Sequence, residues 1–181
     1  MIVCGIDPGN KGGVSFVETS PFKLVACYDM PLAEKTVPSQ RKGTKTTTEI
    51  SGMIFKDLLL RHNPLVVYME HILPSYGAKG GKKQGSVSNS KFYGDFRYLS
   101  GIIDCLNIPR VLVYPQVWKK KLGLIGEDKS ESVRLAMNLF SDDKELFYRA
   151  NKRDKEKIIL LDGRAESALI AYYGLKDREE C

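Results

Sequence analysis

Two acidic residues stand where predicted strands end. Asp7 closes the apolar segment 2–7, and Glu70 follows 65–69, the most apolar run of the chain. A carboxylate that faces a protein core costs several kcal/mol unless it has a partner. An Asp before Pro8-Gly9 is also common in polar turns, so a turn remains the alternative for Asp7 taken alone.

A second pair of acids begins the last predicted helix. Asp162 and Glu166 are four residues apart, on the stripe that continues as Leu169, Ile170 and Tyr173. Like charges at this spacing repel each other, so a positive group is expected between them. The alternative is a capping acid at Asp162 and a solvated charge at Glu166.

The four acids together offer only hard oxygen ligands, the type that holds Mg²⁺ or Mn²⁺ and not zinc. Two such ions about 4 Å apart can activate a water and stabilise the leaving oxygen of a phosphodiester. If the acids Asp7, Glu70, Asp162 and Glu166 converge, the chemistry they predict is metal-dependent phosphodiester hydrolysis.

The elements that must position these acids follow an α/β order. In the first half of the chain we expect strands at 2–7, 13–18 and 24–30, a helix from the capping box 46–49 (TTTE) to His62, a strand at 65–69 and a loop at 71–90. In the second half we expect a helix at 92–106, a strand at 110–114, a short helix from Pro115 and a helix at 130–140. An irregular segment at 142–157 then leads to a last helix at 160–173, stopped by Gly174. This order fits one domain, residues 1–181, with a mixed five-stranded sheet and helices on both faces.

The composition favours a polyanionic partner. The chain has 28 Lys and Arg against 22 Asp and Glu, a net charge of +6. No apolar run approaches the roughly 20 residues of a membrane helix, so no membrane partner is expected. The first strand follows Met1 directly, which predicts no targeting segment. Four scattered cysteines, Cys4, Cys27, Cys105 and Cys181, indicate neither a zinc site nor a disulfide framework.

Basic and aromatic residues are concentrated in the segment 71–94, which contains no acid. Lysines and glycine amides suit phosphate contacts, and aromatic rings can stack on exposed bases. The predicted nucleic-acid contacts are Lys79, Lys82, Lys83 and Lys91, with Tyr76, Phe92 and Tyr93 as stacking candidates, and a second basic group at Arg41, Lys42 and Lys45; a third runs from Lys119 to Lys121. A solvated flexible loop is the alternative. His71 is expected to help orient the site or simply to pack, and Trp118 to lie in the core.

Five motifs in order carry a family resemblance. They are IDPG with a following GG at 6–13, Glu70, PQVWKK at 115–120, DKSESVR at 128–134 and DGRAESALIAYYG at 162–174. Together they resemble the RuvC-type Holliday-junction resolvases, most closely the phage-encoded and chloroplast branch, over residues 2–174. The last motif is the most specific.

The resemblance implies an RNase H-like fold, a homodimer formed with the help of the helix 92–106, and no small-molecule cofactor besides two divalent ions, Mg²⁺ with Mn²⁺ as a substitute. By position it gives the ligand roles to Asp7, Glu70, Asp162 and Glu166, and places Lys129 first, or Lys119 second, near the scissile phosphate. Some RuvC proteins instead have their two final acids three residues apart with a histidine nearby, whereas here Arg164 lies within a gap of four.

The function expected from residues and resemblance is a structure-selective endonuclease that resolves four-way DNA junctions by paired nicks, in recombination and repair, within the cytoplasm of a bacterial or phage-infected cell. A nuclease of the same fold for another nucleic acid, such as structured RNA, is the first alternative. The second is a junction-binding protein without catalysis. An actin-like ATPase is a poor fit because 181 residues are too few for its two lobes.

Overall fold

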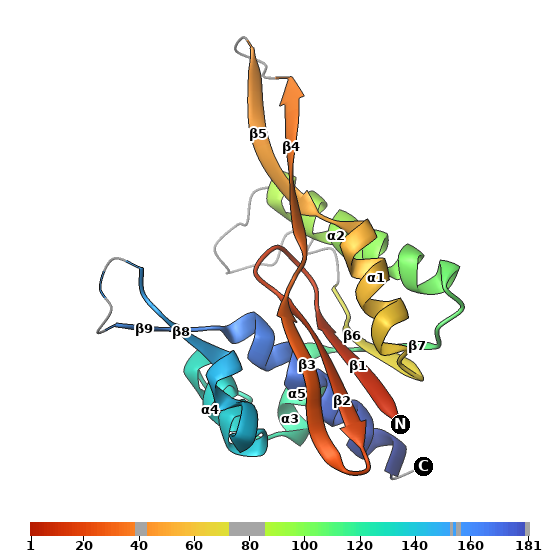
Figure 1. Ribbon diagram of the computed structural model, residues 1–181, viewed down its shortest axis with the longest axis vertical. Helices are drawn as coiled ribbons and strands as arrows, with labels where there is room; N and C mark the ends of the chain where they lie inside the picture. Colours follow the sequence, from red (N-terminus) through yellow and green to blue (C-terminus); the bar gives the residue numbers. More distant parts are fainter. Residues whose placement is uncertain (39–42, 73–85, 153, 155–156, 180–181) are drawn as a thin grey trace.

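A five-stranded mixed sheet forms the centre of the molecule (Figure 1). The computed structural model describes residues 1–38, 43–72, 86–152, 154 and 157–179. Strands β1 (Ile2–Asp7), β2 (Gly13–Thr19) and β3 (Phe22–Asp29) form an antiparallel meander, and β6 (Val66–Glu70) and β7 (Arg110–Val113) continue the sheet parallel to β1 in the order β3-β2-β1-β6-β7. The predicted mixed five-stranded sheet is therefore confirmed.

Helices cover both faces because successive strand residues point to opposite sides. On one face, Val3 and Tyr68 pack with α3 (Pro115–Lys121), α4 (Lys129–Leu139) and α5 (Asp162–Glu179). On the other, Cys4 and Met69 pack with α1 (Gly52–His62) and α2 (Ser86–Cys105). The helix α5 lies very close to β1, since a Cβ on Gly5 would be 2.1 Å from the Ser167 carbonyl oxygen.

A β-hairpin replaces the start of the first predicted helix. Strands β4 (Leu32–Pro38) and β5 (Thr44–Ile50) pair antiparallel over seven residue pairs and project away from the main sheet (Figure 1). The predicted capping box at 46–49 was therefore wrong: β-branched threonines fit the extended pairing, and α1 begins only at Gly52. Ser51 is the actual N-cap, its hydroxyl accepting from the Ile54 amide at 3.4 Å.

Three other predicted boundaries were also wrong. Helix α2 starts at Ser86, inside the predicted loop, and the segment predicted as irregular contains a 3₁₀ helix η1 (Ser141–Phe147) and the strand β8 (Tyr148–Ala150), which pairs with β9 (Ile158–Leu160). Helix α5 begins at Asp162 and continues past Gly174. That glycine permits close packing instead of ending the helix, because a Cβ there would be 2.4 Å from the Tyr68 ring. In the described ranges no helix is long and apolar enough to cross a membrane.

Candidate active site at the carboxyl ends of β1 and β6

The two strand-end acids are neighbours. Parallel pairing sets Ile6 of β1 opposite Met69 of β6, so Asp7 and Glu70 leave the sheet at the same edge. The first turn of α5 lies against the turn that follows Asp7, since a Cβ on Gly163 would be 2.1 Å from the Lys11 carbonyl oxygen. The carboxylates of Glu70, Glu166 and Asp162 all act to raise the pKa of Asp7, which shows that the four predicted acids are close enough to interact.

Burial is the main cause of the electrostatic strain at this edge. It raises the pKa of Asp7 well above its ordinary value, and the neighbouring carboxylates of Glu70 and Glu166 raise that pKa further. Burial also raises the pKa of Glu70. The hydrogen bond from the indole N–H of Trp118 acts in the opposite direction and lowers that pKa. The site therefore favours a positive group that would neutralise these acids.

Two lysines supply part of this positive charge. The Lys119 ammonium pairs with Glu166 Oε1 at 2.8 Å, and the Lys129 ammonium with Asp162 Oδ2 at 2.5 Å. The bond to Asp162 in turn raises the pKa of Lys129. Each of the last two acids thus has its own lysine, where the sequence predicted one positive group between them. The two lysines differ in exposure, because the side chain of Lys119 is 28% exposed and that of Lys129 is 76% exposed.

The donor set fits a hard divalent cation, since all four side chains offer carboxylate oxygens. In the described part of the chain, no group of three or more His, Cys, Asp or Glu side chains is arranged to hold a metal ion. Two of the four acids are instead bound by Lys119 and Lys129. The metal-ligand roles of Asp7, Glu70, Asp162 and Glu166 stay predictions.

Trp118 is a site residue that sequence reasoning missed. The prediction that it lies in the core is confirmed, because its side chain is fully buried. Its indole N–H also donates to Glu70 Oε2 at 2.9 Å, and the Lys119 ammonium lies 5.0 Å from its ring centroid. A buried tryptophan usually finds an acceptor for its N–H, and this was the available signal. Ser132 of α4 is a second such residue, since its hydroxyl donates to Glu166 Oε1 at 3.5 Å.

The first half of α2 contacts the loop that follows Asp7. The Lys91 ammonium donates to Asn10 Oδ1 at 3.2 Å and to Asp95 at 3.1 Å, and a Cβ on Gly9 would be 2.6 Å from the Phe92 ring. Tyr93 stacks on Phe96. The DNA contacts predicted for Lys91, Phe92 and Tyr93 stay predictions, and those for Tyr76, Lys79, Lys82, Lys83, Arg41 and Lys42 lie outside the described residues.

Two residues near the acids have structural partners. The His71 ring packs against Phe96 and Tyr114, at centroid distances of 5.6 and 4.8 Å, which agrees with the packing interpretation. Arg164, the residue within the last acid pair, donates to both carboxylate oxygens of Asp29 at 2.7 and 2.9 Å. Its charge is therefore directed to β3.

Comparison with known proteins relates this fold to RuvC. "T. thermophilus RuvC in complex with Holliday junction substrate" matches with a TM-score of 0.58 at 13% identity, covering 99% of this chain and 96% of that chain. "Thermus thermophilus RuvC structure" matches with a TM-score of 0.52 at 12% identity, covering 98% and 97%. No protein-family model and no curated protein matches the chain. The chain has the RNase H-like fold of RuvC, as the sequence predicted.

Proposed function

We propose that this protein is a metal-dependent endonuclease that resolves four-way DNA junctions and belongs to the phage-encoded and chloroplast branch of the RuvC-type resolvases. The proposal is supported by the position of Asp7 and Glu70 at the ends of the paired strands β1 and β6, and by the effect of Glu70, Glu166 and Asp162 in raising the pKa of Asp7. A RuvC-like fold over nearly the whole chain supports it, since one of the similar structures is a complex with a Holliday junction.

In the proposed mechanism, Asp7, Glu70, Asp162 and Glu166 would hold two Mg²⁺ ions. Bound there, the ions would supply an activated water and neutralise charge on the leaving oxygen. Trp118 fixes the orientation of Glu70 through its indole N–H. Lys119, which is mostly buried, positions Glu166 through its ion pair, and the Ser132 hydroxyl donates to the same oxygen.

Lys129 is the better candidate for contact with the scissile phosphate. Its side chain is 76% exposed, so the ammonium can turn from Asp162 to a phosphate oxygen without leaving a buried gap. A charge held beside the reacting phosphate stabilises the transition state more than the bound substrate. This exposure agrees with the sequence-based preference for Lys129 over Lys119.

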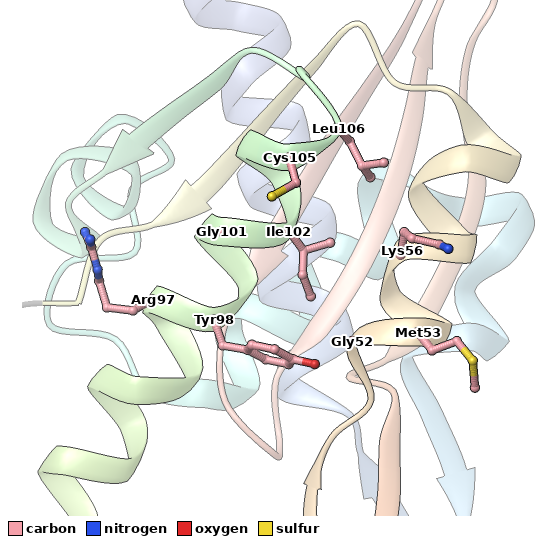
Figure 2. Close-up of a pocket in the computed structure, with 9 residues that line it drawn as sticks. All are labelled: Gly52, Met53, Lys56, Arg97, Tyr98, Gly101, Ile102, Cys105 and Leu106. Carbon is pink, nitrogen blue, oxygen red and sulfur yellow. The ribbon is translucent and has the colours of Figure 1, made fainter.

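Resolution by paired nicks needs two active sites, and the groove between α1 and α2 offers a surface for a second copy of the chain. The groove has a volume of about 570 Å³ and includes Met53, Tyr98 and Ile102 (Figure 2). Met53 is 71% exposed and Tyr98 50% exposed, and a contiguous apolar patch of this kind can mark an interaction surface. A two-fold dimer through α2 would give two equivalent sites for the two equivalent strands of a junction.

A nuclease for another nucleic acid is the second candidate, because the same four acids would serve any phosphodiester. The test is to incubate the protein with a labelled four-way junction and with a linear duplex of matched sequence, in Mg²⁺ and in chelator, beside Asp7→Asn. We expect the unchanged protein to make symmetric cuts in the junction in Mg²⁺. We expect no cuts in chelator and none by Asp7→Asn. Equal cutting of the duplex would favour the second candidate, and junction binding without any cutting would favour a non-catalytic role.

A further inference from the structure

A second hollow lies beside Asp162, and none of the residues that line it comes from α3 or α4, the helices that carry Lys119 and Lys129. It has a volume of about 410 Å³ and forms where the β1–β2 turn, the start of β4, the β8–β9 hairpin and the first turn of α5 meet. Asp162 therefore belongs both to the candidate active site and to the wall of this hollow.

Two cations at this hollow have no acidic partner among the residues that the structure describes. Lys11 and Arg149 line it and are exposed, and neither forms an ion pair with a described residue. The third cation, Arg164, differs because Asp29 binds its guanidinium through two hydrogen bonds. Lys11 and Arg149 are thus available for an anion from outside the protein.

Apolar side chains form another part of the same wall. Leu32 and Leu160 line the hollow and are 36% and 43% exposed, beside the buried Met30. Exposed leucines next to unpaired cations suit a ligand that carries an anionic group and an apolar face. A nucleotide has this combination in its phosphate and its base or sugar.

We propose that this hollow binds one nucleotide of the substrate strand next to the cleaved phosphodiester, with Lys11 and Arg149 on its phosphate and Leu32 and Leu160 against its sugar or base. The proposal rests on the proposed function, because the shared residue Asp162 is what places the hollow beside the cleavage point. The subsite would fix the register of the strand before cleavage, which phosphate contacts commonly do.

The test measures DNA affinity in chelator, so that cleavage does not enter. Lys11→Ala, Arg149→Ala and the double variant are compared with the unchanged protein on a four-way junction and on a single strand of the same sequence. Lys23→Ala is the matched control, because Lys23 lies at the opposite end of β3 and pairs with Glu18 at 3.1 Å. The plot of log affinity against log salt should become shallower, its slope decreasing in magnitude by about 0.7 to 0.9 for each phosphate that a variant no longer neutralises. The control should keep the slope of the unchanged protein.

A second set of substrates carries one neutral methylphosphonate at each successive position around the cut, and its scan with the unchanged protein locates the phosphate contacts without any variant. One position should weaken binding of the unchanged protein and leave binding of the double variant unaffected. Arg149→Lys should keep most of the affinity. The proposal is overturned if the double variant binds both DNAs as the Lys23→Ala control does, or if the unchanged protein binds neither DNA. It is also overturned if no methylphosphonate position weakens binding of the unchanged protein alone. Competition by a free nucleoside monophosphate, at concentrations where other phosphates have no effect, would overturn it as well.

Failure of the proposed function would look different from failure of the subsite. The former would be absence of junction cutting in Mg²⁺ by a protein whose binding to single strands still depends on Lys11 and Arg149. The latter would be intact junction cutting by the double variant, with an unchanged salt dependence.

Discussion

The buried indole N–H of Trp118 donates to the carboxylate of Glu70 at 2.9 Å. The bond joins the first turns of α3 to the end of β6, and it opposes the effect of burial on the pKa of Glu70. A hydrogen bond to an ionised acceptor contributes more than one between neutral groups. Trp118 is therefore a positioning residue for an acid that we expect to bind metal.

Trp118→Phe should weaken cleavage and leave junction binding intact. Without the indole donor the pKa of Glu70 rises, so the acidic limb of the pH–rate profile should move to higher pH and more Mg²⁺ should be needed for half-maximal rate. We expect the rate near neutral pH to fall by about tenfold, as when one hydrogen bond that orients a metal ligand is removed. The measurement is cleavage rate against pH and Mg²⁺ concentration. A lower melting temperature with an unshifted pH profile would mean that Trp118 is only a core residue.

Asp7→Asn should stabilise the metal-free protein near neutral pH while it abolishes cleavage. The pKa of Asp7 is raised in the folded state, so the folded protein binds more protons than the unfolded chain between the two pKa values. Stability of the unchanged protein therefore falls as pH rises from the ordinary Asp pKa, about 3.9, through the raised value. The variant lacks this loss, and its advantage in melting temperature should grow with pH over the same range.

Thermal unfolding in chelator at several pH values checks this effect. Mg²⁺ or Mn²⁺ should raise the melting temperature of the unchanged protein, because binding to the native state alone stabilises it, and should not raise that of Asp7→Asn. Equal melting curves for the two proteins at every pH would show that the Asp7 carboxylate is not held against its neighbours.

The sequence could predict the placement of Asp7 and Glu70, because each ends a strand whose apolar run is visible without any tertiary information. It could not predict the bond from Trp118 to Glu70, because the two residues are 48 positions apart and only the packing of α3 on the sheet brings them together. The helix cap predicted at 46–49 was wrong for a local reason. A Thr-x-x-Glu pattern can cap a helix or alternate along a strand, and its pairing with β4 decided for the strand.

Lys129→Ala and Lys119→Ala should separate catalysis from stability. Lys129 is mostly exposed, so the loss of its ion pair should change stability by less than about 1 kcal/mol, whereas cleavage should fall by about a hundredfold. Lys119→Ala leaves Glu166, which is only 7% exposed, without its ammonium partner and should destabilise the metal-free protein by about 1 to 3 kcal/mol. Chemical denaturation and single-turnover cleavage measure the two effects. Equal effects of the two variants on both measurements would contradict this division of roles.

The last prediction concerns the groove between α1 and α2, and it uses two glycines of α2. A Cβ on Gly101, which lines the groove, would meet no atom within 4 Å, and the same holds for Gly94, which does not line it. Gly101→Glu should therefore leave the fold of one chain intact and obstruct only a partner seated on this face (Figure 2). Gly94→Glu is the matched control. We expect a dimeric mass for the unchanged protein and for the control, and a monomeric mass for Gly101→Glu.

The unchanged protein and Gly101→Glu can then be incubated with a supercoiled plasmid that carries an extruded cruciform. A dimer cuts both strands in one binding event, so the unchanged protein should yield linear plasmid. Gly101→Glu should yield nicked circles, because the first nick releases the supercoiling and the cruciform is reabsorbed before a second encounter. A monomeric mass for the unchanged protein, with nicked circles as its main product, would contradict the paired-nick mechanism and favour a general nuclease of the same fold. Linear product from a Gly101→Glu protein that is still dimeric would place the dimer interface on another face.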